Sequence, residues 1–130
     1  MTNSEKLFIP LIKAREAAKV FVEDILYIET DGRKVGIHID GERLCMYAKL
    51  AELEGFLDKR FYKCHSRCII NLDKVVKMKN QEVVFDNGAR VYLSRQKFTD
   101  AIRFYKGYIL REREREGKTG THRDLAQKTL

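Results

Sequence analysis

The chain has 130 residues, of which 44% are hydrophobic and 35% are charged, a composition that indicates one globular domain and excludes a largely disordered chain. The formal charge of +7 is unevenly spread: residues 60–97 carry nine Lys or Arg against three Asp or Glu, whereas residues 1–59 carry nine against eleven. A concentrated cationic region on a folded domain is typical of nucleic-acid binding, and less often of an anionic membrane surface. The simpler alternative is a basic surface with no partner.

We expect neither a signal peptide nor a membrane span in the N-terminal sequence, because Pro10 and Lys13 interrupt its short apolar run. Three cysteines, an odd number, occur at positions 45, 64 and 68. An odd number of cysteines is typical of proteins in a reducing compartment. We therefore expect a cytoplasmic protein without a membrane partner.

Short strands dominate the predicted structure up to residue 49. Residues 14–20 are ambiguous, since their alanines favour a helix whereas the flanking residues favour strands. The next three segments are rich in strand formers and are separated by two Asp-Gly turn signals, which predicts a three-stranded meander. These segments are 25–30, 34–39 and 43–49.

The period of the apolar residues changes after the meander. Leu50, Leu53 and Leu57 fall on one face of a helix, with Phe56 beside them. We therefore expect a short amphipathic helix near residues 49–58 that docks on the sheet.

The stretch FYKCHSRCIINL, residues 61–72, contains two cysteines, a histidine and two cations within a few positions. Its aromatic and β-branched ends predict a single strand, in which Cys64 and Cys68 lie roughly 13 Å apart at about 3.3 Å per residue. At that separation they cannot share a zinc ion or form a disulfide. The strand also points His65 away from both thiols, which disfavours a catalytic cysteine.

The same alternation divides this stretch into two faces. Tyr62, Cys64, Ser66, Cys68 and Ile70 form the small or apolar face that we assign to the core. The opposite face presents Lys63, His65 and Arg67, which either contact an anionic partner or are merely solvated. No sequence signal assigns the cysteines, Cys45 included, a redox role.

Residues 82–94 predict the clearest hairpin, with Asn87-Gly88 supplying both positive-φ positions of a type I′ turn. Ser94 then has the character of a helix N-cap. Apolar residues follow at helical spacing, which predicts a closing helix near 95–113; they are Phe98, Ile102, Tyr105 and Ile109. The remaining residues lose this periodicity, so we expect a flexible tail over 114–130 that frays beyond about Gly117.

Three segments of the chain together resemble the LytTR domain, the DNA-binding output module of LytR/AlgR-type bacterial transcription regulators. They are ILYIET (25–30), LDKRFYKCHSRCIINLDKV (57–75) and FDNGARVYLSRQK (85–97). The most specific pieces are Phe61, His65-Ser66-Arg67 and Asn71 at their spacing, and Asn87-Gly88 leading to Ser94-Arg95. The resemblance spans roughly residues 7–106.

The resemblance implies a mainly β fold of about ten short, mostly antiparallel strands in small sheets, with one or two short helices. It also implies that residues 14–18 form a turn between two strands. We accordingly expect an N-terminal tail over residues 1–6 and a LytTR-type domain over 7–113.

The resemblance further implies sequence-specific binding to direct-repeat promoter sites on double-stranded DNA, as two protomers whose loops enter successive major grooves. Carried over by position, the DNA-binding residues are Arg33, Lys34, His65, Ser66, Arg67, Ser94 and Arg95. We add Lys63, from the cationic face of residues 61–72, and the neighbouring cation Lys97 to the expected DNA-binding residues. Arg95 and the Arg33-Lys34 loop are expected to contact bases, and the 65–67 segment to lie near the DNA backbone. The family also implies a loop at Ser66, in conflict with the inward position that the alternation gives it.

Asn71 is instead expected to brace the backbone where its strand ends. We expect no enzyme activity, no cofactor and no metal. The chain has no room for the phosphoacceptor receiver that often precedes such domains, so we expect a stand-alone regulator, controlled by a partner protein, or a segment of a longer chain. The alternative function is an RNA-binding or protein-interaction module that uses the same cationic face.

Overall fold

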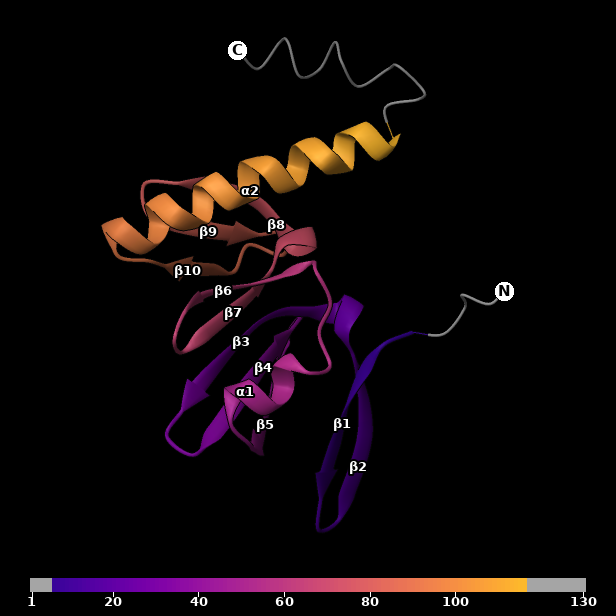
Figure 1. The fold of residues 1–130 in the computed structure, drawn as a ribbon. Coiled ribbons are helices and arrows are strands. Elements are labelled where there is room, and N and C mark those ends of the chain that lie inside the picture. Colours follow the sequence, from indigo (N-terminus) through magenta and orange to yellow (C-terminus); the bar gives the residue numbers. More distant parts are fainter. Residues whose placement is uncertain (1–5, 117–130) are drawn as a thin grey trace.

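The computed structural model describes residues 6–116, which form ten strands and two α-helices (Figure 1). The strands are β1 (Phe8–Lys13), β2 (Glu16–Phe21), β3 (Ile25–Asp31), β4 (Lys34–Ile39), β5 (Glu42–Tyr47), β6 (Phe61–His65), β7 (Cys68–Asn71), β8 (Val75–Lys79), β9 (Glu82–Phe85) and β10 (Arg90–Tyr92). The helices are α1 (Leu50–Glu54) and α2 (Arg95–Glu116), and single 3-10 turns occur at Val22–Asp24 and Leu72–Lys74. Both the mainly β class and the expected number of strands are confirmed.

The strands form three antiparallel sheets. A five-stranded sheet of order β5-β4-β3-β7-β6 lies between the β1–β2 hairpin and a three-stranded sheet of order β10-β9-β8. The hairpin and α1 pack on one face of the central sheet, and the three-stranded sheet and α2 pack on the other. Each face therefore has its own hydrophobic core.

Strand alternation supplies both cores from the same strands. In β7, Ile69 belongs to the core under α1 and the hairpin, whereas Cys68 and Ile70 belong to the core under α2. Successive side chains of a strand point to opposite faces, so a strand buried on both sides is apolar throughout. All four residues of β7 are buried, in agreement with its central position.

Two N-terminal strands are present as the family resemblance implies, but the turn between them is shorter than the predicted 14–18, because residues 16–18 belong to β2. The chain turns at Ala14 and Arg15, and the alanine-rich residues beyond form β2 rather than a helix. Val20 pairs with Ile9 across this hairpin and both are buried, so tertiary burial overrides the helical propensity of the alanines. The predicted meander corresponds to β3, β4 and β5, and its turns contain Gly32 and Gly41 at φ of 64° and 76°.

The helix predicted near residues 49–58 is present but shorter. It ends at Glu54, and Gly55 follows as its C-cap. Leu50 and Leu53 are buried as predicted, and Leu57 packs on the same core from beyond the helix. Glycine is a poor helix former, which explains the early end.

The prediction of one continuous strand over residues 61–72 is wrong. The chain forms β6, turns at Ser66 and Arg67, and returns as β7, so that His65 pairs with Cys68. Ser66 is exposed rather than part of the core. The turn contains no Gly, Pro, Asn or Asp, which is why the residues alone did not reveal it.

The prediction of a type I′ turn at Asn87-Gly88 is also wrong. Among these two residues only Gly88 has a positive φ, at 92°. The Asn87 side chain instead accepts a hydrogen bond from Ala89 N–H at 2.9 Å. Two consecutive positive-φ residues occur at Asn80 and Gln81, in the two-residue connection between β8 and β9.

Helix α2 begins where Ser94 predicts. Ser94 Oγ accepts a hydrogen bond from Lys97 N–H at 3.2 Å, as an N-cap does. The inward face differs from the prediction at one position, because Ile109 is 43% exposed whereas Ala101 and Tyr108 are buried. The helix extends to Glu116, and the predicted fraying beyond Gly117 falls outside the described residues. Within residues 6–116, no helix combines the length and apolarity needed to cross a membrane.

Candidate nucleic-acid interface

Three connections that carry predicted DNA-binding residues emerge along one edge of the molecule. They are the β3–β4 turn, the β6–β7 turn and the start of α2, which follow one another along the left side of Figure 1. Two backbone hydrogen bonds fix the first two turns: Thr30 N–H donates to Arg67 C=O at 3.0 Å, and Ala48 N–H donates to Arg33 C=O at 3.4 Å. Segments far apart in the sequence thus lie along one edge.

The β3–β4 turn presents Arg33 and Lys34 to solvent. Asp31 starts the turn and Gly32 allows the left-handed backbone conformation that it requires. The ammonium group of Lys34 lies 5.2 Å from the centre of the Tyr47 ring, a cation–π contact that limits its motion without neutralising it.

A polar cluster braces the strands behind this turn. Glu29 Oε2 lies 2.7 Å from His38 Nε2 and accepts a hydrogen bond from Arg43 Nε at 3.2 Å, while Arg43 Nη2 reaches Asp31 at 3.4 Å. Burial by itself raises the pKa of Glu29, but the bonds from His38 and Arg43 outweigh it, and the pKa is lowered. Glu29 therefore remains an anion that holds Arg43 on the sheet.

The β6–β7 turn carries His65, Ser66 and Arg67. His65 Nδ1 accepts a hydrogen bond from Arg67 N–H at 3.1 Å. In the neutral ring this bond assigns the proton to Nε2, which can then donate to an anion outside the protein. Ser66 and Arg67 are exposed at the tip of the turn.

The third segment joins β10 to α2 at Ser94 and Arg95. Gln81 holds Leu93, the residue before Ser94, through two hydrogen bonds. The Gln81 backbone C=O accepts from Leu93 N–H and the Gln81 side-chain amide donates to Leu93 C=O, each at 2.9 Å. Arg95 and Lys97 are exposed in the first turn of α2. The N-terminus of a helix has a partial positive charge, which adds to these cations and favours phosphate.

The arginines of this edge have no acidic partner among residues 6–116, in contrast to several arginines elsewhere. Arg33, Arg67 and Arg95 form no ion pair there, whereas the guanidinium groups of Arg60 and Arg90 are paired with carboxylates at 2.9 and 3.0 Å. An exposed, uncompensated guanidinium can donate two parallel hydrogen bonds to a guanine edge or a phosphate.

Lys63 is placed differently from the other predicted site residues. Its ammonium forms an ion pair at 2.9 Å with Glu54, the last residue of α1. The pair directs Lys63 toward α1 and partly neutralises it. Lys63 is therefore the weakest candidate among the predicted contacts.

Asn71 has the structural role expected from its position. It is fully buried, its amide donates to Ile25 C=O at 2.8 Å, and its carbonyl accepts from Asp73 N–H at 2.9 Å. These bonds tie the end of β7 to the start of β3. The spacing between the β6–β7 turn and the β3–β4 turn is thereby fixed from inside the fold.

The two buried cysteines are close together, contrary to the separation predicted from a single strand. The β6–β7 turn brings Cys64 and Cys68 onto facing strands, and Cys64 Sγ donates to Cys68 C=O at 3.4 Å. Both thiols are free. The contact with Cys64, together with burial, strongly raises the pKa of the Cys68 thiol, so Cys68 stays protonated. The described residues contain no cluster of three or more metal-ligating side chains.

Gln81 is a contributor that the sequence analysis missed. It touches no predicted DNA contact directly but fixes the backbone that precedes Ser94 and Arg95. A signal for it was present in the sequence. Asn80 and Gln81 separate two apolar runs, which is typical of a two-residue hairpin connection, although Gln is unusual at the second position.

Comparisons with known proteins identify the family of this chain. The sequence model of the LytTr DNA-binding domain family matches residues 15–103. Accessory gene regulator protein A of Staphylococcus epidermidis is 30% identical over 90 residues, and that of Staphylococcus aureus is 29% identical over the same length. Each alignment covers 66% of this chain and 37% of the relative, so the chain matches well under half the length of these proteins.

The fold also matches a solved structure, the LytTr DNA-binding domain of a Bacillus cereus protein. The superposition has a TM-score of 0.63 and covers 79% of this chain and 99% of the other, at 23% identity. The superposition shows that the two share a fold. The match to the family model over residues 15–103 shows that the chain belongs to the LytTr DNA-binding domain family.

Proposed function

We propose that this protein binds double-stranded DNA in a sequence-specific manner and regulates transcription. The observation that carries the proposal is the common edge on which the β3–β4 turn, the β6–β7 turn and the start of α2 emerge, with three arginines that have no acidic partner among the described residues. Family membership supports the same activity.

In the proposed complex, the two outer segments enter successive major grooves. Arg33 and Lys34 enter one, and Arg95 enters the next, where an arginine can bond to both acceptors of a guanine edge. His65, Ser66 and Arg67 lie between them and contact the sugar–phosphate backbone. Ser94 and Lys97 bind phosphate beside the helix N-terminus.

We further propose that two protomers bind side by side on direct repeats. A single domain contacts only a short half-site, and two half-sites raise both affinity and specificity through effective concentration. Control by a separate partner protein is part of this proposal. The chain itself contributes DNA recognition.

The test is selection of bound fragments from a random duplex library, followed by salt titration of the recovered site. Specific binding predicts a recurrent motif and an affinity that falls with log salt at a slope of about −0.9 per phosphate neutralised. The spacing of the recovered half-sites reports whether two protomers bind together. If random duplex displaces the protein as well as the selected site does, sequence-specific recognition is wrong. Tighter binding to single-stranded or duplex RNA would favour an RNA-binding module instead.

A further inference from the structure

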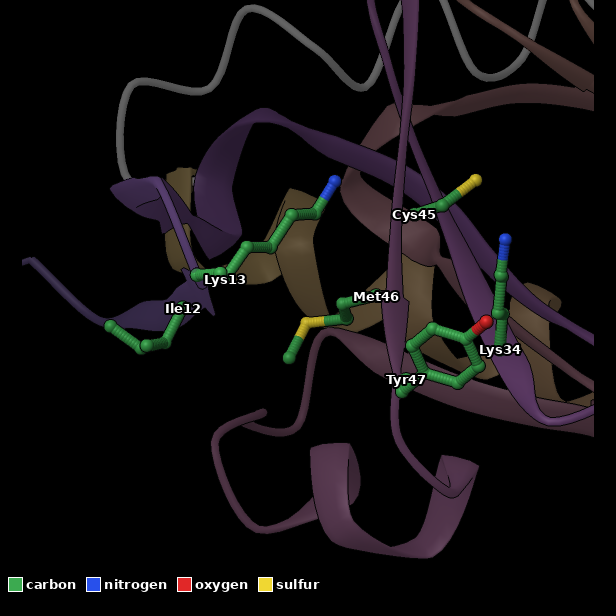
Figure 2. A pocket seen from close by; sticks show the side chains of 7 residues that line it. Ile12, Lys13, Lys34, Cys45, Met46 and Tyr47 are labelled. Carbon is green, nitrogen blue, oxygen red and sulfur yellow. The ribbon is translucent and has the colours of Figure 1, made fainter.

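A groove of about 360 Å³ lies beside the outer strand of the five-stranded sheet, where the β1–β2 hairpin approaches β5. Ile12 and Lys13 line it from the hairpin, Lys34 lines it from β4, and Met46 and Tyr47 line it from β5 (Figure 2). Its volume is at the lower end of the range of small-molecule sites, which is roughly 300–1,000 Å³.

The groove is apolar in its middle and gathers two unusually exposed apolar side chains. Ile12 is 65% exposed and Tyr47 is 74% exposed, although both are large. Figure 2 shows the Met46 side chain extending between them toward the hairpin. A ligand with an apolar body would remove this surface from water, which is favourable at about 25 cal/mol per Å².

Two ammonium groups flank this apolar surface. Lys34 has no acidic partner among the described residues, and the ammonium of Lys13 is 3.7 Å from Glu16 in a half-exposed pair that contributes little. No Asp or Glu belongs to the described lining of the groove. The combination suits a ligand with one negative charge attached to an apolar body, rather than a phosphodiester, which lacks that body.

We infer that this groove binds a small organic anion with an apolar body, such as an aryl or alkyl carboxylate or sulfonate. The apolar body covers Ile12, Met46 and Tyr47, and the ammonium groups of Lys13 and Lys34, on either side of it, both attract the anionic group. Lys34 also belongs to the β3–β4 turn, so the anion and DNA compete for its ammonium group. This competition rests on the proposed function, and by linkage each ligand weakens the other equally.

The test uses 8-anilinonaphthalene-1-sulfonate and its uncharged analogue N-phenyl-1-naphthylamine, titrated by fluorescence into the full chain. The sulfonate is expected to bind more tightly than the uncharged compound. Lys13→Ala should weaken sulfonate binding about twofold to fivefold and leave the uncharged compound unaffected. Ile12→Ser should weaken both, because it removes apolar contact.

Lys106→Ala is the matched control, since it removes an exposed lysine of α2 that is not part of the groove. It should change neither titration. Ile12 is largely exposed, so Ile12→Ser should leave the thermal unfolding midpoint unchanged, and Tyr47→Ser provides a second variant of the same kind. Sulfonate binding that is unaffected by Lys13→Ala, Ile12→Ser and Tyr47→Ser would overturn the inference.

A second arm separates this inference from the proposed function. Addition of a selected duplex should displace the sulfonate, and the sulfonate should raise the dissociation constant of the duplex by the same factor. Simultaneous, independent binding of both ligands would refute the competition while leaving DNA binding intact. A chain that binds no duplex in the absence of the sulfonate would refute the proposed function and leave the groove as a site.

Discussion

At the scale of single residues, the buried amide of Asn71 has the clearest energetic role. Its two hydrogen bonds satisfy Ile25 C=O and Asp73 N–H at the junction of β7 and β3. Asn71→Ala removes the buried donor to Ile25 C=O and also the acceptor of Asp73 N–H, so it should lower the free energy of unfolding by about 2–4 kcal/mol. Urea denaturation measures this change.

The matched control for Asn71 is Gln96→Ala. Gln96 is an exposed amide whose contacts with Asp100 are long, at 3.3 and 3.4 Å. Its replacement should change the free energy of unfolding by less than about 0.5 kcal/mol. A loss below about 1 kcal/mol for Asn71→Ala would show that Asn71 is not an important brace.

Arg95 and Lys97 separate base contacts from phosphate contacts within the same helical turn. If Arg95 bonds to a base edge, Arg95→Ala should cost about 1–3 kcal/mol on the selected duplex and reduce the preference over scrambled duplex. Lys97→Ala should weaken both duplexes alike, because phosphates carry no sequence information. Fluorescence anisotropy measures the dissociation constants of both variants and of the unmodified chain on the two duplexes. If Arg95→Ala loses the same affinity for both duplexes, Arg95 does not contact a base.

At the scale of elements, two tyrosine hydroxyls anchor α2 to the segment 73–75. Tyr105 donates to Val75 C=O at 2.7 Å, and Tyr108 donates to Asp73. Burial first, and then the bond to Asp73, raise the pKa of Tyr108, so its hydroxyl remains a donor at neutral pH. These bonds fix the direction of the helix that presents Arg95.

Tyr105→Phe should therefore lower the free energy of unfolding by about 1–2 kcal/mol, since it leaves Val75 C=O without this donor. It should also weaken DNA binding, although Tyr105 is no part of the proposed contact edge. Tyr92→Phe is the control for stability, because that hydroxyl has no partner among the described residues and the side chain is 67% exposed. Unchanged stability in Tyr105→Phe would mean that packing alone positions α2.

Local sequence patterns were sufficient for elements whose signals lie within a few residues. The Asp-Gly turns, the leucines of α1 and the Ser94 cap each correspond to the observed structure. Local patterns missed the turn at Ser66 and Arg67 because it contains no Gly, Pro, Asn or Asp and strand formers lie on both sides of it. That error also separated Cys64 and Cys68, which the turn in fact brings together.

At the scale of the whole molecule, the candidate site depends on contacts that no local pattern predicts. Thr30 bonds to Arg67, and Asn71 bonds to Ile25 across 46 residues. Sequence periodicity assigned cations to the faces of individual elements. It could not show that the β3–β4 turn, the β6–β7 turn and the start of α2 lie on one edge. The family resemblance supplied that grouping, and the strand order shows how the fold achieves it.

The most direct test of the central claim compares two variants that each lose three positive charges. One replaces the edge arginines Arg33, Arg67 and Arg95 with Ala. The other replaces three exposed cations outside this edge with Ala. Lys106 and Arg111 lie in α2, and Lys59 lies in the loop between α1 and β6. Both variants are titrated with the selected duplex over a range of salt concentrations.

If the edge binds DNA, the edge variant should lose at least about a hundredfold in affinity, and its salt dependence should flatten by about one phosphate contact, because only Arg67 of the three is assigned to the DNA backbone. The control variant should retain its slope and most of its affinity. Equal losses in both variants would contradict the account, because binding would then depend on total charge rather than on this edge.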